Sequence, residues 1–219
     1  KGKQKNNLRN KVIILNVIYV LFFVILVICF YKIGKWAYYK NKSQKNISSV
    51  IEDVEVTQDD GNVVEFVQEP QEESVEVKQS DYTYYSNIPF LSVSISKLKE
   101  KNSDSVGWIN INGTNINYPI VKAQDNSYYL THSFDKSYNP AGWIFLDYRC
   151  DLDNLRRNTI IYGHNRLDNT LFGSLANNLN NNWYSNKENR VIRIVTENKS
   201  YVWQIFSTYQ IAKDEEYLD

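Results

Sequence analysis

The chain has 219 residues, with 25 basic and 25 acidic side chains, so its formal net charge is zero. This length suffices for one folded domain with appendages, and the balanced charge excludes the strongly basic field typical of nucleic-acid-binding proteins. Seventeen tyrosines, five tryptophans and alternating Ile/Val segments favour a mainly β fold. The two histidines and two cysteines form no metal-ligand motif, and the glycines form no phosphate-binding loop, so we expect no metal and no nucleic acid.

An apolar segment near the N-terminus is long enough to cross a membrane. Residues 12–33 carry no charge before Lys32, and a helix of that length spans roughly 30 Å of hydrocarbon. A cleavable signal peptide would have a shorter apolar region followed by small residues, whereas Tyr31 and Trp36 here suit an interfacial aromatic belt. We therefore predict a transmembrane anchor at residues 12–33, preceded by a basic tail at residues 1–11.

The charges around this anchor leave its orientation open. Five basic residues precede the apolar run and five follow it closely, so the positive-inside rule gives a tie. The short tail and the long following region favour a cytoplasmic N-terminus.

The segment after the anchor is acidic. Between Glu52 and Glu76 there are ten carboxylates and no basic residue. We interpret residues 34–80 as a solvated spacer that holds a folded domain away from the membrane. A partner-binding segment is the alternative.

The folded part is expected to begin near Asp81. Asn87-Ile88-Pro89 is typical of a helix start. From Ile88 onward, four apolar residues share one helical face: Ile88, Leu91, Ile95 and Leu98. The Asn112-Gly113 pair then predicts a β-hairpin between residues 108–111 and 114–121. In that hairpin five apolar side chains should face inward: Ile109, Ile111, Ile116, Tyr118 and Ile120.

Short strands are expected to make up most of the remaining chain. We predict them at residues 143–148, 159–162, 191–196 and 201–212, with a short helix at residues 170–179. That helix would share an apolar face of Leu171, Phe172, Leu175 and Leu179. Many short strands with few helices indicate a barrel or a sandwich, and the last strand has no partner after it.

His164 is the first candidate for chemistry. It follows a short apolar strand and Gly163, a position that presents an imidazole at the end of a rigid strand. Imidazole suits proton transfer near neutral pH, although a loop histidine that merely titrates is an equal alternative. His132 lies in a polar turn, and we interpret it as solvent-exposed.

Cys150 is the one cysteine outside the apolar run that contains Cys29. A Cys–His pair is a known nucleophilic arrangement, because imidazole can generate or stabilise a thiolate. A single loop thiol is more often inert, so Cys150 is a secondary candidate.

Five ordered segments together resemble class B sortases, which are membrane-anchored cysteine transpeptidases of Gram-positive bacteria. The resemblance runs from about residue 87 to the end of the chain and keeps both the order and the spacing of the segments. They are Val106-Gly107-Trp108-Ile109, Thr114-Asn115-Ile116-Asn117-Tyr118-Pro119-Ile120-Val121, Asp125-Asn126-Ser127-Tyr128-Tyr129-Leu130, Phe145-Leu146-Asp147-Tyr148-Arg149 and Ile161-Tyr162-Gly163-His164-Asn165.

This resemblance implies a fold, a reaction and a location. The fold is a sortase-type β-barrel with N-terminal helices. It lies outside the cell and follows a single transmembrane helix in the sequence. In the implied reaction, a cysteine cleaves a C-terminal sorting signal similar to Asn-Pro-x-Thr-Asn or Pro-x-Thr-Gly after its threonine. A peptidoglycan amine then accepts the surface protein, and no cofactor is needed. His164 matches the catalytic histidine, while Asn126, Leu130 and Tyr162 match positions near the sorting signal.

The sequence departs from the family at its nucleophile. Sortases carry it in a Thr-Leu-Ser-Thr-Cys segment on the seventh strand, with an arginine on the eighth, and neither has a match here. We therefore expect the catalytic Cys and Arg beyond Asp219, a domain at residues 81–219 that lacks its last two strands, and an inactive chain as it stands. The alternatives are an inactive sortase-like binding module at the cell envelope and an unusual Cys150–His164 pair.

Overall fold

The computed structural model describes residues 2–54, 56–59, 84–85, 87–155 and 158–210 of the chain. The chain divides into two compact units, Lys1–Gln44 and Lys45–Asp219. Each unit is described by itself.

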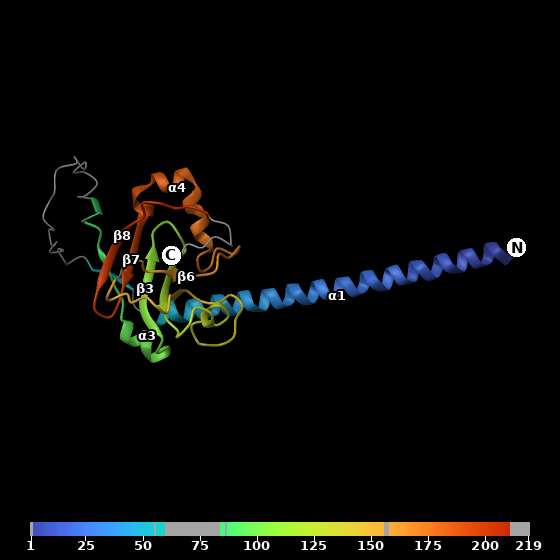
Figure 1. Cartoon of the computed structure of the whole chain (residues 1–219), viewed down its shortest axis with the longest axis horizontal. Coiled ribbons are helices and arrows are strands. Elements are labelled where there is room, and N and C mark those ends of the chain that lie inside the picture. The colour runs from blue at the N-terminus through green and yellow to red at the C-terminus, as the bar shows by residue number, and fades with distance from the viewer. Residues whose placement is uncertain (1, 55, 60–83, 86, 156–157, 211–219) are drawn as a thin grey trace. The chain divides into compact units, whose positions relative to one another are not determined.

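The first unit consists of most of one long helix, α1 (Gly2–Asp53). Among the described residues, α1 is the one helix that is long and apolar enough to cross a membrane. None of its most apolar window is buried, and Lys40 lies over the ring of Trp36, with 5.2 Å between its Nζ and the ring centroid. Figure 1 shows that α1 continues as a helix beyond residue 33, where the predicted anchor ends. This helix is therefore the candidate for the predicted membrane span.

The second unit begins earlier than the sequence suggested. Val50 and Val54, at the end of α1, are 4% and 2% exposed and belong to the apolar core, with Ile47 and Ile51 packed against it. Their spacing is a helical stripe that the acidic composition of the segment obscured. The apolar core therefore includes side chains that precede the expected domain start near Asp81. Residues 60–83 of the predicted spacer lie outside the described residues.

The helix expected from Asn87 onward begins later as well. Phe90–Ser92 forms strand β2, which pairs antiparallel with β1 (Thr57–Asp59). Helix α3 (Ile95–Lys101) starts after Ser94, whose side chain accepts a hydrogen bond from the Lys97 backbone N–H and so caps the helix. Pairing with a distant strand therefore replaces the first predicted turn of helix.

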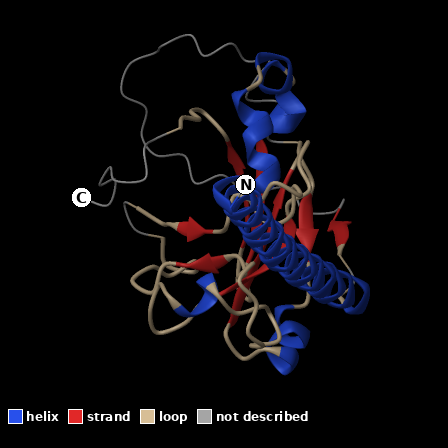
Figure 2. Cartoon of the chain, turned by 90° about the vertical axis from the view of Figure 1, so that its right-hand side faces the viewer, coloured by secondary structure: helices blue, strands red, loops and turns tan. Residues whose placement is uncertain are grey.

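Six strands form one mixed sheet in the order β6-β5-β4-β3-β7-β8. Their bounds are β3 (Ser105–Ile111), β4 (Asn117–Val121), β5 (Phe145–Leu146), β6 (Ile161–Tyr162), β7 (Val191–Val195) and β8 (Ser200–Gln204). β4 and β5 are parallel, and every other pair in this sheet is antiparallel. The predicted hairpin is confirmed, with Ile109 opposite Tyr118, and Figure 2 shows the short strands in red.

Both faces of the β3–β4 hairpin are buried. The five side chains predicted to face inward are each at most 4% exposed, and Trp108 is fully buried as well. Since Trp108 and Ile109 are consecutive on a strand, they point to opposite faces of the sheet. Trp143 packs edge-on against Tyr118 and donates its indole N–H to the Pro119 carbonyl at 2.9 Å. The hairpin is therefore the centre of the core.

The sheet curls without closing within the part of the chain that the structure describes. Its edge strands, β6 and β8, border an apolar pocket of about 600 Å³, whose lining includes Ile161, Ile194 and Trp203. β8 ends at Gln204, well before the predicted end at residue 212. This open sheet is the partial barrel expected from the resemblance.

Short helices occupy the connections. They are η1 (Tyr128–Leu130), η2 (Gly173–Leu179), α4 (Asn181–Ser185) and η3 (Lys187–Arg190). The predicted helix at residues 170–179 is thus a 3-10 helix that starts at Gly173. Leu171 is buried as expected, but Leu179 is 53% exposed because η2 does not keep the α-helical period on which its apolar face was based.

Two loops are anchored by carboxylates that are paired with an arginine two residues away. Asp147 accepts hydrogen bonds from Arg149, and Asp168 accepts them from Arg166 and Thr170. The side chains of Asp147 and Asp168 are 0% and 7% exposed. Hydrogen bonds from the arginine side chains lower the pKa of both carboxyl groups well below the usual range.

The fold predicts that one buried leucine carries far more stability than an exposed one. Leu98 on α3 is fully buried, so Leu98→Ala should lower the free energy of unfolding by about 2–5 kcal/mol. Leu167, which is fully exposed, is the matched control and should change it by less than about 0.5 kcal/mol as Leu167→Ala. Urea unfolding of the detergent-solubilised chain, followed by tryptophan fluorescence, measures both. Equal losses would contradict the packing described for α3.

The two paired carboxylates predict a loss of stability in acid. Their pKa is lower in the folded chain than the unfolded value of about 3.9, so the stability they contribute is present above about pH 4. It is lost as the pH falls below that value, with a slope of at most about 1.4 kcal/mol per pH unit for each group. Urea unfolding between pH 2 and pH 6 should show a shallower slope for Asp147→Asn. The exposed Glu100→Gln should follow the parent chain, and an unchanged slope for Asp147→Asn would refute the assignment.

Candidate functional site

His164 follows strand β6 and is half-buried. Its Nε2 lies 2.9 Å from the backbone carbonyl oxygen of Leu130. A carbonyl oxygen only accepts, so Nε2 carries the proton and donates it. Nδ1 makes no hydrogen bond to any residue that the structure describes. The ring is therefore oriented through one nitrogen, and the other nitrogen is the one that can exchange a proton with a substrate.

Gly142 allows the chain to pass close to this histidine. It has a φ of +65°, and a Cβ at this position would lie 2.5 Å from the Tyr129 carbonyl oxygen, 2.8 Å from that of Leu130 and 3.0 Å from Cδ2 of His164. A side chain would therefore strain the backbone and collide with the hydrogen bond that orients the ring. This role was not predictable from sequence, because an isolated glycine in a loop has many explanations.

The loop that carries Leu130 is fixed by buried polar contacts. The Tyr129 side chain is fully buried; its hydroxyl donates to Asp104 at 2.7 Å and accepts from the Asn102 amide at 2.9 Å. Burial raises the pKa of this phenol. The Tyr129 carbonyl also accepts the Trp143 backbone N–H at 2.9 Å. Tyr129 is thus fixed through both its hydroxyl and its carbonyl, and it directly precedes Leu130, whose carbonyl accepts the His164 proton.

The remaining predicted groove residues meet at Asp147, at the end of β5. Its Oδ2 accepts hydrogen bonds from the Asn126 amide at 2.8 Å and from the Tyr162 hydroxyl at 3.0 Å. The Asn126 carbonyl oxygen accepts the Tyr148 backbone N–H at 3.0 Å. The structure therefore links Asn126 to Tyr162 through Asp147, and Leu130 to His164 directly. The sequence analysis singled out all of these residues except Asp147 as site residues.

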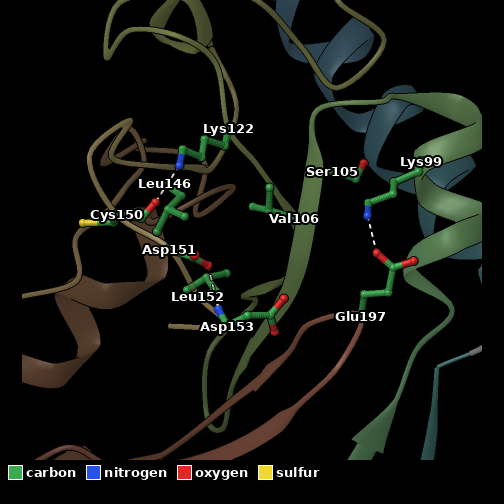
Figure 3. A pocket seen from close by; sticks show the side chains of 10 residues that line it. All are labelled: Lys99, Ser105, Val106, Lys122, Leu146, Cys150, Asp151, Leu152, Asp153 and Glu197. Carbon is green, nitrogen blue, oxygen red and sulfur yellow. Dashed lines mark hydrogen bonds and ion pairs between the residues drawn. The ribbon is translucent and has the colours of Figure 1, made fainter. Parts of the chain in front are cut away.

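Cys150 has different surroundings. Its Sγ donates a weak hydrogen bond to the Asn158 carbonyl oxygen at 3.6 Å, and Lys122 donates to the Cys150 carbonyl at 2.6 Å. Figure 3 shows the sulfur pointing away from Lys122. The pocket beside it has a volume of about 120 Å³ and is lined by Lys99, Ser105, Val106, Lys122, Leu146, Cys150, Asp151, Leu152, Asp153 and Glu197. His164 is not among these residues, so no contact supports a Cys150–His164 pair.

The second histidine differs from its prediction. His132 is half-buried; its ring stacks on Tyr128 with 4.1 Å between the centroids, and its Nδ1–H donates to the Tyr128 carbonyl at 2.8 Å. The stacking partner is four residues away in a turn, which the polar composition of the segment did not reveal. Among the described residues, no group of His, Cys, Asp and Glu could hold a metal ion.

Comparisons with known proteins converge on one family. No family model matches the chain. Sortase B of Staphylococcus aureus (strain NCTC 8325 / PS 47) is 36% identical over 121 residues, which cover 55% of this chain and 49% of that protein. Sortase B of Listeria monocytogenes serovar 1/2a is 37% identical over 126 residues, which cover 56% and 49%. The chain spans about half the length of the curated relatives it matches.

Solved structures agree with these relatives. A Staphylococcus aureus sortase B–substrate complex matches with a TM-score of 0.54 and 35% identity over 57% of each chain. A crystal structure of Staphylococcus aureus sortase B matches with a TM-score of 0.53 and 35% identity, covering 57% of this chain and 58% of that one. Over about half of its length, the chain is therefore similar in sequence and in fold to class B sortases.

Proposed function

We propose that this chain carries the histidine of a sortase-type cysteine transpeptidase, and that His164 is that residue. The observation that carries the proposal is the oriented imidazole at the end of β6, with Nε2 donating to the Leu130 carbonyl. Over 57% of its length, the chain is similar to a sortase B that has been solved with a substrate. The reaction class is acyl transfer from a C-terminal sorting signal to an amine.

In this reaction a thiolate attacks the carbonyl carbon of the threonine in the sorting signal. The C–N bond breaks as His164 gives a proton to the departing amine, and a thioester remains on the enzyme. An incoming peptidoglycan amine then loses a proton to His164, attacks the thioester and releases the thiolate, so that the thiolate and the protonated histidine are both regenerated. Because Nε2 is bound to Leu130, Nδ1 is the nitrogen that transfers both protons.

The thiol and the arginine of this reaction are proposed to lie beyond Asp219 in the full protein. One observation supports this placement of the thiol, and another supports this placement of the arginine. The Cys150 thiol donates a weak hydrogen bond to the Asn158 carbonyl oxygen. The pocket that Cys150 lines does not include His164. Among the residues that the structure describes, the arginines nearest to His164 in sequence, Arg149 and Arg166, are each paired with a carboxylate.

The proposed substrates are surface proteins with a signal similar to Asn-Pro-x-Thr-Asn or Pro-x-Thr-Gly. Asn126, Leu130 and Tyr162 are proposed to line the groove for this signal, and their shared connection to the His164 region supports that role. The apolar part of α1 supports a single-pass anchor at residues 12–33. We propose that residues 1–11 lie in the cytoplasm and the folded unit lies outside the cell. The acceptor is then a peptidoglycan cross-bridge amine or its lipid-linked precursor.

Trapping the acyl-enzyme tests this function. The intact protein, incubated with a sorting-signal peptide and no amine, should gain the mass of the peptide's N-terminal fragment on a cysteine other than Cys29 and Cys150. His164→Gln should slow turnover by about 10²–10⁴-fold, because it removes the acid and base. Peptide mapping by mass spectrometry locates the thioester.

Two variants serve as controls for this experiment. His132→Gln should retain turnover, because His132 stacks on Tyr128 away from the Leu130 carbonyl. Cys150→Ala should leave the thioester in place. A thioester on Cys150 would refute the assignment of the nucleophile, and peptide binding with no acylation at all would instead identify an inactive binding module.

Gly142 provides a second prediction, on the orientation of His164. Gly142→Ala places a Cβ in the left-handed region and against two carbonyl oxygens, so unfolding should become easier by about 1–3 kcal/mol. Turnover should fall by about 100-fold, because the Leu130 carbonyl can no longer hold the ring in place. Gly34→Ala is the control, since a Cβ there meets no atom within 4 Å. Wild-type turnover in Gly142→Ala would contradict the proposed orientation.

A further inference from the structure

The Asp147 carboxylate has more hydrogen bonds than an ordinary ion pair needs. Oδ1 accepts from the Arg149 backbone N–H and from its Nε, each at 2.9 Å. Oδ2 accepts from Arg149 Nη2 at 2.8 Å, from the Asn126 amide at 2.8 Å and from the Tyr162 hydroxyl at 3.0 Å. A carboxylate offers about four lone-pair sites, so this one is fully used. Since the side chain is 0% exposed, each of these donors replaces water.

Asp147 determines which way the Asn126 amide points. The Asn126 NH₂ group faces the carboxylate, and its carbonyl oxygen faces the Tyr148 backbone N–H. A flipped amide would set oxygen against the carboxylate and NH₂ against an N–H, so the charge on Asp147 excludes it. The second N–H of Asn126 makes no hydrogen bond to any described residue. Asp147 therefore sets the direction of a donor that a peptide carbonyl could use.

The same carboxylate fixes Tyr162, the residue two positions before His164. The Tyr162 hydroxyl donates to Asp147, and its ring packs on Phe145 with 5.1 Å between the centroids. The Asp147 backbone N–H also donates to the Ile160 carbonyl at 2.9 Å. Asp147, directly after β5, therefore contacts both the backbone just before β6 and the Tyr162 side chain within β6.

Arg149 allows this carboxylate to stay charged while buried. Its guanidinium donates two parallel hydrogen bonds, and half of the Arg149 side chain remains exposed to solvent. A buried carboxylate without such a partner would be strongly unfavourable. The pair Arg166–Asp168 has the same chemistry, but its described side-chain partners all lie within the loop from residue 166 to 170.

We propose that Asp147 is a positioning residue for the sorting-signal groove. It orients the Asn126 amide and the Tyr162 hydroxyl, which both donate to its Oδ2, and Arg149 neutralises its charge. This inference rests on the proposed function, because it assigns Asn126 and Tyr162 to the groove. It goes further by naming the residue that fixes the groove before a peptide arrives.

Peptide binding by the intact protein tests this role. A fluorescein-labelled Asn-Pro-Ala-Thr-Asn peptide, followed by anisotropy, should bind Asp147→Asn about tenfold or more weakly than wild type. The substitution keeps the size of the side chain but sets an amide against the Asn126 NH₂ group. Asp168→Asn is the matched control: it also loses a carboxylate–arginine pair, and its affinity should stay within about twofold of wild type.

A spectroscopic readout separates positioning from stability. With 3-fluorotyrosine placed at position 162, the ¹⁹F resonance should shift in Asp147→Asn and stay in place in Asp168→Asn, even if both variants unfold at equally lowered temperatures. In a double-mutant cycle, adding Tyr162→Phe to Asp147→Asn should weaken binding less than Tyr162→Phe does alone. Should Asp147→Asn fail to fold, Tyr162→Phe alone should weaken binding by about two- to tenfold, because it removes only the hydroxyl.

The outcomes distinguish this inference from the function on which it rests. Wild-type affinity in Asp147→Asn, or equal losses in Asp147→Asn and Asp168→Asn, would overturn the positioning role and leave the sortase assignment intact. Wild-type affinity in Tyr162→Phe would do the same where Asp147→Asn does not fold. A wild-type protein that binds no peptide would overturn the proposed function, and the groove assigned to Asn126 and Tyr162 with it.

Discussion

The loop at residues 125–130 is held by hydrogen bonds to the segments that directly follow β5 and β6. Asn126 is bonded to Asp147 and to the Tyr148 backbone, and the Leu130 carbonyl receives the His164 proton. Each of these groups would lose substantial free energy if it were buried without a partner. The hydrogen bonds that this loop makes therefore determine the shape of the site, and one of them orients the His164 imidazole.

Rigidity at this position has a chemical consequence. An acid that must protonate an amine and then take a proton from another amine works best when its ring does not have to be reoriented between the two steps. The bond from Nε2 to Leu130 provides this, and Gly142 permits it by leaving room beside both groups. Because the Tyr129 hydroxyl and carbonyl are both engaged, the carbonyl next to it has little freedom to follow the ring.

Local signals predicted the local features of this fold and missed those that depend on distant partners. The Asn112-Gly113 pair and the alternating Ile residues predicted the β3–β4 hairpin correctly, because turn chemistry and strand period act within a few residues. The place of Val50 and Val54 in the apolar core was not predicted, because the acidic composition around them hid a helical stripe. The helix start was wrong because β2 pairs with a strand more than 30 positions away in sequence.

The site shows the same division. His164 could be identified because a strand, a glycine and a histidine occur together, whereas Asp147 carries no signal of its own. Asp147–Arg149 and Arg166–Asp168 are alike as local sequence: each is a carboxylate and an arginine two residues apart. Only the three-dimensional arrangement shows that the described side-chain partners of Asp168 are local, while Asp147 also binds Asn126, 21 positions away, and Tyr162, 15 positions away.

A charged hub of this kind limits how the groove can respond to a substrate. Moving Asn126 or Tyr162 would leave a buried carboxylate with fewer donors, which costs more than breaking a hydrogen bond between neutral groups. The two side chains therefore hold their places in the free protein, and a peptide must fit the groove as it stands. Under the proposed function, selection among sorting signals then depends on the fit of the peptide to Asn126 and Tyr162 as they stand, and these two side chains lose little ordering entropy when the peptide binds.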